Sequence, residues 1–210
     1  MRQEDWAEGW KQHFPVIRLG RLIILPSWEE APCEKEDAVL RIDPGMAFGT
    51  GTHATTRLCL EEIVSLFDSP DPPRKVLDVG TGSGILALAA AALGAPRVLG
   101  TDIDEEACRA AQENAARNGM EERVEIRVSP LEELESDYDL VLANILAEEL
   151  ARMSRALVER LGPGGILVLS GILREKESLI DEVFSPLPVT GLGIRRTGEW
   201  SCIVYRRRSE

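Results

Sequence analysis

The chain has 210 residues, 44% of them hydrophobic, which is enough to bury one substantial core and favours a single domain with a small appendage. Its 36 acidic residues outnumber its 24 basic ones, giving a net charge of −12, so the surface repels phosphate backbones and argues against a nucleic-acid partner. No apolar run reaches the roughly 18 residues of a membrane span, and Met1–Trp10 carries no signal-peptide core, so we expect a cytoplasmic protein without membrane contact.

The cysteines are too scattered to suggest a metal site. No two of them form a CxxC pair, and the chain is long enough to fold without disulfides, so we predict reduced thiols and no bound metal. The four residues are Cys33, Cys59, Cys108 and Cys202.

From Lys75 onward, strand-like and helix-like segments alternate. The expected strands are Lys75–Val79, Arg97–Asp102, Val124–Val128, Tyr138–Asn144 and Gly165–Ser170. The expected helices are Ile85–Leu93, Glu105–Asn118, Ala147–Leu161 and Lys176–Phe184. This alternation predicts right-handed crossovers and a doubly wound, mainly parallel α/β sheet.

Glycines mark the ends of two of these segments. Asn118-Gly119 predicts a helix stop, because glycine readily adopts the left-handed conformation there. The run Gly162–Gly165 predicts a turn between helix and strand.

The C-terminal segment breaks the alternation. Val189–Arg196 and Trp200–Arg206 are predicted to form a hairpin through Thr197-Gly198-Glu199. A parallel sheet closed by an antiparallel hairpin is the Rossmann-like layout of class I S-adenosylmethionine-dependent methyltransferases, whereas a dehydrogenase domain continues with parallel units. This is the fold class we predict.

Residues 1–74 follow a different pattern. Val16–Leu25 is strand-like and interrupted by Gly20, Ala38–Ile42 is a candidate to pair with it, and Thr52–Phe67 has helical character. The segment is too short and broken for its own core. We therefore expect 1–74 to be an extension, a β-hairpin and a loop–helix lid packed on a cofactor-binding catalytic domain at 75–210.

A glycine-rich turn follows the first strand of the predicted catalytic domain. Gly80, Gly82 and Gly84 form G-x-G-x-G, in which the lack of Cβ lets backbone approach a ligand closely. A dinucleotide site prefers a third glycine at the position occupied here by Ile85. The motif therefore indicates a nucleoside cofactor without pyrophosphate.

Two carboxylates accompany this turn. Asp102 ends the next strand, where an acidic side chain can accept both hydrogen bonds from a ribose diol. Asp78 precedes the glycines and is suited to organising the loop and the positively charged amino end of the cofactor. Both are predicted cofactor-binding residues.

Asn144 ends a further predicted strand, at the same edge of the sheet as Gly80 and Asp102. Its side-chain carbonyl could accept a hydrogen bond from a target amine and orient the lone pair toward an electrophilic methyl group. Alternatively, it could be the N-cap of the helix Ala147–Leu161. The residues alone leave both readings open.

Several motifs together resemble the ribosomal protein L11 methyltransferase family. They are Asp43–Thr56, Asp78–Gly84, Asn144–Ala147 and Ser170–Leu173, and the similarity runs from about Trp6 to the C-terminus. The loop Phe48–Thr56 is the most specific of them. The resemblance implies transfer of a methyl group from S-adenosylmethionine to α-amino and lysine ε-amino groups of L11, with S-adenosylhomocysteine as product.

The resemblance also implies roles for particular residues. Cofactor contacts would fall on Thr56, Gly80, Asp102 and Asn144. The loop from Phe48 to His53 would close over the cofactor, with Phe48 excluding water. His53 would either help to remove a proton from the amine or serve as a structural loop histidine.

The resemblance does not extend to one feature of the family. Members carry a small N-terminal domain that recognises L11, and the chain opens at about the linker that follows it, Asp5–Trp10. We expect the chain to be either a fragment of a longer protein or a shortened relative, and in the second case the chemistry would carry over while the substrate need not. The leading hypothesis is N-methylation of L11. The alternatives are N-methylation of another protein or a small molecule, and cofactor binding without catalysis. The sequence makes no prediction of the oligomeric state.

Overall fold

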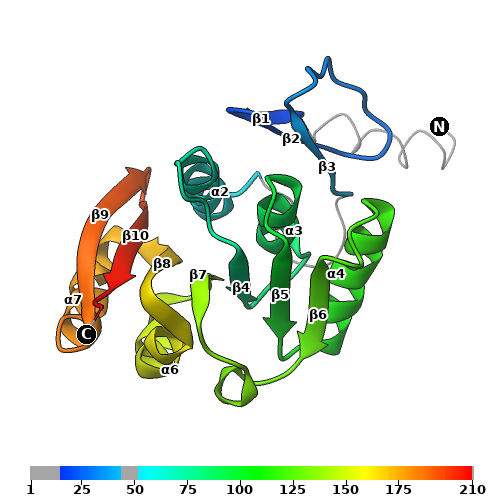
Figure 1. The fold of residues 1–210 in the computed structure, drawn as a ribbon. Helices are drawn as coiled ribbons and strands as arrows, with labels where there is room; N and C mark the ends of the chain where they lie inside the picture. Colours follow the sequence, from blue (N-terminus) through cyan, green and yellow to red (C-terminus); the bar gives the residue numbers. More distant parts are fainter. Residues whose placement is uncertain (1–14, 44–51, 210) are drawn as a thin grey trace, which may run out of the picture.

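A seven-stranded, mainly parallel sheet forms the centre of the structure. The computed structural model describes residues 15–43 and 52–209, and the strands lie in the order β6-β5-β4-β7-β8-β10-β9 (Figure 1). Their bounds are β4 Lys75–Val79, β5 Arg97–Asp102, β6 Val124–Val128, β7 Tyr138–Asn144, β8 Leu161–Leu173, β9 Val189–Thr197 and β10 Trp200–Arg207. Strand β10 is antiparallel to β8 and β9, and the other pairs are parallel. The predicted doubly wound sheet with a C-terminal hairpin is confirmed.

Helices cover both faces of this sheet. One face carries α2 Ala54–Phe67, α3 Ile85–Ala92 and α4 Glu105–Arg117, and the other carries α5 Ala147–Arg152, α6 Ser154–Arg160 and α7 Glu177–Phe184. Two short 3₁₀ turns, η2 Leu131–Glu133 and η3 Arg174–Lys176, complete the connections. Each layer of helices shares a buried apolar cluster with its face of the sheet.

Helix α4 begins and ends where its sequence predicts. The carboxylate of Asp104 accepts a hydrogen bond from the backbone N–H of Glu106 at 2.9 Å, which satisfies a donor that the first turn leaves unpaired. Gly119 follows the helix with φ +62°, so the predicted stop at Asn118-Gly119 is confirmed.

Two local predictions on the other face are wrong. The helix expected over Ala147–Leu161 is divided at Met153, whose ψ of 3° interrupts it between α5 and α6. The run Gly162–Gly165, expected as a turn, lies inside β8 as a bulge between the pairs Tyr138–Leu161 and Leu140–Ile166. A Cβ at Gly165 would lie 2.7 Å from the carbonyl oxygen of Tyr138, so glycine lets β8 stay close to β7.

A small three-stranded sheet lies above α2 and α3, away from the main sheet (Figure 1). Strands β1 Ile17–Leu19 and β2 Leu22–Leu25 form an antiparallel hairpin, and β3 Ala38–Arg41 adds to β2 in parallel. Leu22, Ile24 and Leu40 are buried in one cluster with α2 and α3.

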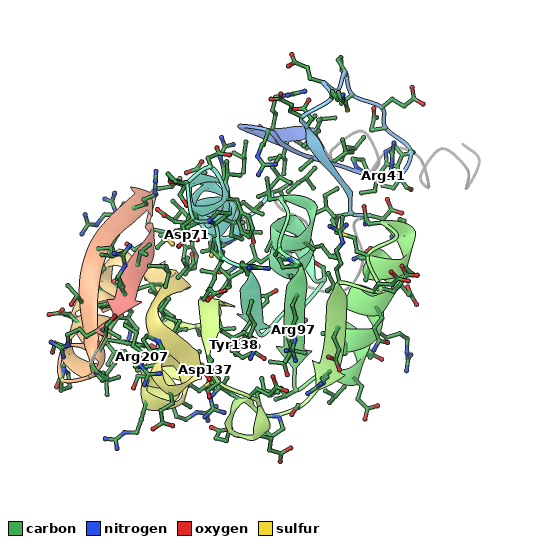
Figure 2. All side chains as sticks on the ribbon, viewed as in Figure 1. Arg41, Asp71, Arg97, Asp137, Tyr138 and Arg207 are labelled. Carbon is green, nitrogen blue, oxygen red and sulfur yellow. The ribbon has the colours of Figure 1, made fainter. Side chains whose placement is uncertain are left out.

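The end of β3 is attached to the C-terminus of α4. The side chain of Asn118 accepts from the backbone N–H of Arg41 and donates to the carbonyl of Arg41, both at 2.8 Å. Figure 2 labels Arg41 at this end of the small sheet. None of the helices in the described residues combines the length and the hydrophobicity that a bilayer-spanning helix requires.

Candidate active site

The glycine loop is fixed to the end of the neighbouring strand. Gly80, Gly82 and Gly84 have φ values of +70°, +54° and +80°, a region that disfavours residues with a Cβ. The backbone N–H groups of Gly80 and Thr81 both donate to the carbonyl of Thr101 on β5, each at 2.9 Å. The loop therefore holds a defined shape at the carboxyl edge of the sheet.

Asp102 connects this loop to the start of α4. Its Oδ2 accepts from the backbone N–H of Gly82 at 3.0 Å, and its Oδ1 accepts from the backbone N–H of Asp104 at 3.1 Å. The residue is half-buried and lies on the wall of a cavity. Its carboxylate is thus oriented by backbone donors and keeps a side open to a ligand.

Asp78 is buried inside the loop, with 1% of its surface exposed. Its Oδ2 accepts from the hydroxyl of Thr81 at 2.7 Å and from the backbone N–H of Ala87 at 3.2 Å. Burial raises the pKa of Asp78 to about 6, against these two hydrogen bonds, which lower it. The side chain therefore organises the strand–loop–helix junction from within.

A cavity of about 600 Å³ opens at the ends of β4, β5 and β7. Gly80, Asp102 and Asn144 contribute to its lining, and Ile103, 85% exposed, lies beside Asp102. We call it the nucleoside cavity. Its remaining lining residues are Val79, Thr101, Ser129, Pro130, Leu131, Glu132, Ile145, Glu149, Arg152 and Met153.

Asn144 does not cap the helix that follows it. The N-cap of α5 is Leu146, and no side chain bonds to that helix start, so the capping alternative is wrong. Instead, Nδ2 of Asn144 donates to Oγ1 of Thr56 on α2 at 3.3 Å. Its Oδ1 is buried and has no hydrogen-bond partner among the residues described, which leaves a strong acceptor available.

A second cavity, of about 420 Å³, also has Asn144 in its lining. We call it the acceptor cavity. The rings of His53 and Trp200 meet edge to face within its lining, with centroids 5.1 Å apart. Its other lining residues are Thr55, Asn144, Ile145, Leu146, Glu149 and Gly171. Asn144, Ile145 and Glu149 line both cavities, and we call these three residues the partition between them.

The remaining predicted site residues lie around the start of α2. His53 is the N-cap of this helix, where Nδ1 accepts from the backbone N–H of Thr55 at 3.4 Å and lies 2.8 Å from its hydroxyl. Thr56 is fully buried behind Asn144 and contacts the site through it. Phe48 lies outside the described residues.

Several residues that line these cavities were given no role from the sequence, and three of them come from separate elements. Glu149 on α5, Gly171 on β8 and Trp200 at the start of β10 all reach the acceptor cavity. Gly171 carried the clearest sequence signal, because a glycine within a strand often marks a close backbone approach, and its φ of +82° agrees with that. Trp200 comes from the antiparallel strand, and the rule for parallel strand ends does not cover it.

The parallel sheet with its terminal hairpin, the glycine loop and the acidic end of β5 define a class I S-adenosylmethionine-dependent methyltransferase. A solved structure of this class from Synechocystis PCC 6803, magnesium protoporphyrin IX methyltransferase with bound S-adenosylmethionine, superimposes with a TM-score of 0.60 over 79% of this chain and 86% of its own. At 22% identity it shows the fold alone. Within this class, the chain belongs to the ribosomal protein L11 methyltransferase family, whose family model matches residues 1–208.

Individual relatives agree with this membership. The ribosomal protein L11 methyltransferase of Syntrophotalea carbinolica is 59% identical over 206 residues, and that of Geobacter sulfurreducens is 53% identical over 207. The matches cover 98% of this chain and 67% of each relative. The crystal structure of ribosomal protein L11 methylase from Lactobacillus delbrueckii subsp. bulgaricus has a TM-score of 0.83 and 38% identity, covering 92% of this chain and 98% of its own.

Proposed function

We propose that this enzyme transfers a methyl group from S-adenosylmethionine to an amine of ribosomal protein L11, a lysine ε-amino or an α-amino group, in the cytoplasm. The observation that carries the proposal is the buried, unpartnered Oδ1 of Asn144 between the two cavities. The names of the relatives point to ribosomal protein L11 as the protein that receives the methyl group. The net charge of −12 supports a basic protein partner and disfavours a nucleic acid.

The residues around the nucleoside cavity fit S-adenosylmethionine. Asp102 offers a carboxylate to a ribose diol. A Cβ at Gly80 would lie 2.7 Å from the side chain of Ile145, so glycine keeps the loop close to the wall of the cavity. Gly82 and Gly84 hold the turn, and Asp78 braces it from inside and contributes negative charge toward the cofactor's amino group.

The acceptor cavity suits the aliphatic stem of a lysine. An amine can attack only in its neutral form, and a free lysine ammonium has a pKa of about 10.4. Desolvation among Ile145, Leu146 and Trp200 lowers that pKa and favours the nucleophile. When bound, the cofactor supplies an electrophilic methyl group, and displacement by the amine leaves S-adenosylhomocysteine.

Asn144 orients the amine in this scheme. Oδ1 of Asn144 accepts a hydrogen bond from an N–H of the substrate amine, while Nδ2 is held by Thr56. The lone pair of the substrate amine is then directed across the partition, toward the nucleoside cavity. His53, beside Trp200, is the candidate to receive the proton that the amine must lose, and Phe48 is the candidate to exclude water. Thr56 acts through Asn144.

The test is methyl transfer to purified L11 from labelled S-adenosylmethionine, with wild-type enzyme and Asn144→Ala. We expect wild type to label L11 and Asn144→Ala to lose about 100-fold in kcat, because the orienting acceptor is removed. Affinity for S-adenosylhomocysteine should change by less than about threefold. Asn144→Asp keeps an acceptor oxygen and should retain part of the activity.

Other outcomes assign other functions. Transfer only to different proteins or small amines would show that the acceptor is not L11. Binding of the cofactor without turnover on any acceptor would indicate a non-catalytic module. An Asn144→Ala enzyme with wild-type kcat would remove Asn144 from the reaction.

A further inference from the structure

Ile145 lies between two glycines on opposite sides. Strand β7, which leads into Ile145, lies between β4 and β8, and these strands end near Gly80 and Gly171. A Cβ at Gly80 would be 2.7 Å from the Cγ2 of Ile145. A Cβ at Gly171 would be 2.9 Å from the carbonyl carbon and 3.1 Å from the nitrogen of Ile145, and closer still to its oxygen.

The two contacts hold different parts of Ile145. Gly80 meets the side chain, which can rotate or be shortened, whereas Gly171 meets the backbone, which has no alternative position without moving Asn144. Gly171 therefore fixes how far the backbone of Asn144 and Ile145 lies from β8. The neighbouring residue is anchored as well, because Ser170 pairs in register with Asn144 and its hydroxyl donates to the carbonyl of Thr55 at 3.0 Å.

This arrangement controls the partition between the cavities. Asn144 and Ile145 line both the nucleoside cavity and the acceptor cavity, and Gly171 lines the acceptor cavity. Ser170 and Thr55 are buried, so the end of β8 cannot shift freely relative to α2. The position of the partition therefore depends on how closely β8 lies against Ile145.

Building on the proposed function, we propose that Gly171 is a positioning residue for methyl transfer. By admitting the backbone of Ile145 at a distance that no side chain allows, it sets the separation between a group held in the nucleoside cavity and an amine in the acceptor cavity. A Cβ at this position displaces the partition toward Gly80. A misplacement of about 1 Å is enough to lower the rate of a proximity-dependent reaction by about 100-fold.

The experiment compares Gly171→Ala with Gly119→Ala. Gly119 has a similar positive φ, +62°, but no atom within 4 Å of its Cβ position, and it lies outside both cavities. Both variants carry the cost of a left-handed alanine, and only Gly171→Ala meets the backbone of Ile145. Readouts are the Tm, kcat and KM with L11, and the Kd for S-adenosylhomocysteine by calorimetry.

We expect both variants to lose Tm, and only Gly171→Ala to lose about 100-fold in kcat, with a smaller change in KM. Its Kd for S-adenosylhomocysteine should rise by about fivefold, because Ile145 also lines the nucleoside cavity. If wild type does not act on L11, the proposed acceptor fails while the Kd comparison still tests the positioning role. A Gly171→Ala enzyme that matches Gly119→Ala in kcat and Kd overturns the inference.

A milder variant covers the case in which Gly171→Ala does not fold. Ser170→Ala removes the bond to Thr55 without introducing any new atom, so it loosens the same strand end. We expect a folded protein with kcat reduced about fivefold and a smaller change in KM. A folded Ser170→Ala enzyme with unchanged kcat would contradict the positioning role of this strand end.

Discussion

The hydroxyl of Thr56 accepts a hydrogen bond from the side-chain amide of Asn144 at 3.3 Å, joining the first turn of α2 to the end of β7. The two residues are far apart in sequence, and Thr56 is fully buried. This bond decides which end of the Asn144 amide faces the cavities: the amide nitrogen is engaged and the oxygen is left to accept. The proposed role of Asn144 as a hydrogen-bond acceptor therefore depends on Thr56, which lines neither cavity.

Thr56→Val is expected to lower kcat about fivefold. Valine keeps the shape of threonine but removes the acceptor for Asn144, and a bond worth about 1 kcal/mol corresponds to roughly that factor. The Kd for S-adenosylhomocysteine should stay within about twofold of wild type. The measurement is steady-state kinetics with L11, and Thr190→Val on the exposed edge of β9 is the control. Equal kcat values for the two variants would show that Thr56 does not orient Asn144.

Two substitutions of His53 separate its capping role from chemistry. Asparagine is a good N-cap, so His53→Asn should keep the stability that His53→Ala loses, about 1 kcal/mol. If the imidazole takes a proton from the amine, both variants should lose about 100-fold or more in kcat. Urea unfolding measures the effect on stability, and the pH profile of kcat measures the effect on catalysis. Full activity in His53→Asn would limit His53 to a structural role.

Asp78 is expected to make stability fall as pH rises. Burial raises its pKa from 3.8 to about 6, so the unfolded state releases the proton first, and the folded protein loses stability between about pH 4 and 6. Above pH 6 the loss is complete, and its upper limit is roughly 3 kcal/mol. Asp78→Asn should remove this dependence. Urea unfolding of wild type and Asp78→Asn from pH 4 to 7 tests this prediction. If the free energy of unfolding changes with pH in the same way in both proteins, the pKa of Asp78 is not raised.

Glu177 is expected to act in the opposite direction at lower pH. Its carboxylate accepts two hydrogen bonds from Arg196, both at 2.7 Å, and one from Ser201, and Arg196 is the main cause that lowers its pKa to about 2. A lowered pKa stabilises the fold above the unfolded value, 4.5, and this contribution disappears as pH falls through 2.

Glu177→Gln should therefore cost roughly 1–2 kcal/mol at neutral pH and progressively less below pH 4.5. The comparison is the free energy of unfolding of wild type and variant at several pH values. The control is Glu182→Gln on the same helix, an exposed glutamate for which no ion pair is found in the described residues. A difference between wild type and Glu177→Gln that stays constant down to pH 2.5 would contradict the lowered pKa.

Local patterns predicted the elements of the catalytic half well. β4, β5, β6 and β7 have the bounds expected from their β-branched runs. Strands buried on both faces, such as β4 and β7, need continuous apolar residues, whereas the edge strand β6 alternates. The predictions failed where neighbouring strands determine the conformation. The bulge at Gly162–Gly165 depends on the carbonyl of Tyr138, a contact that no local pattern contains.

The site was predictable only in part for the same reason. Strand ends on one parallel sheet share an edge, so Gly80, Asp102 and Asn144 could be grouped from sequence. The bond from Asn144 to Thr56 comes from a helix that precedes the sheet, and Trp200 comes from its last, antiparallel strand. Tertiary packing decides both contacts.

The small sheet above α2 and α3 has a consequence for where the chain can be divided. Helix α3 is apolar nearly all round, with the main sheet on one side and β1–β3 close by in the same cluster, so it is the middle of a stack (Figure 1). A protein shortened to begin at Lys75 would lose α2 and expose α3. We expect it to be a molten globule, expanded and able to bind the hydrophobic dye ANS. We therefore do not expect Lys75, where the sequence pattern changes, to be the boundary of a unit that folds cooperatively.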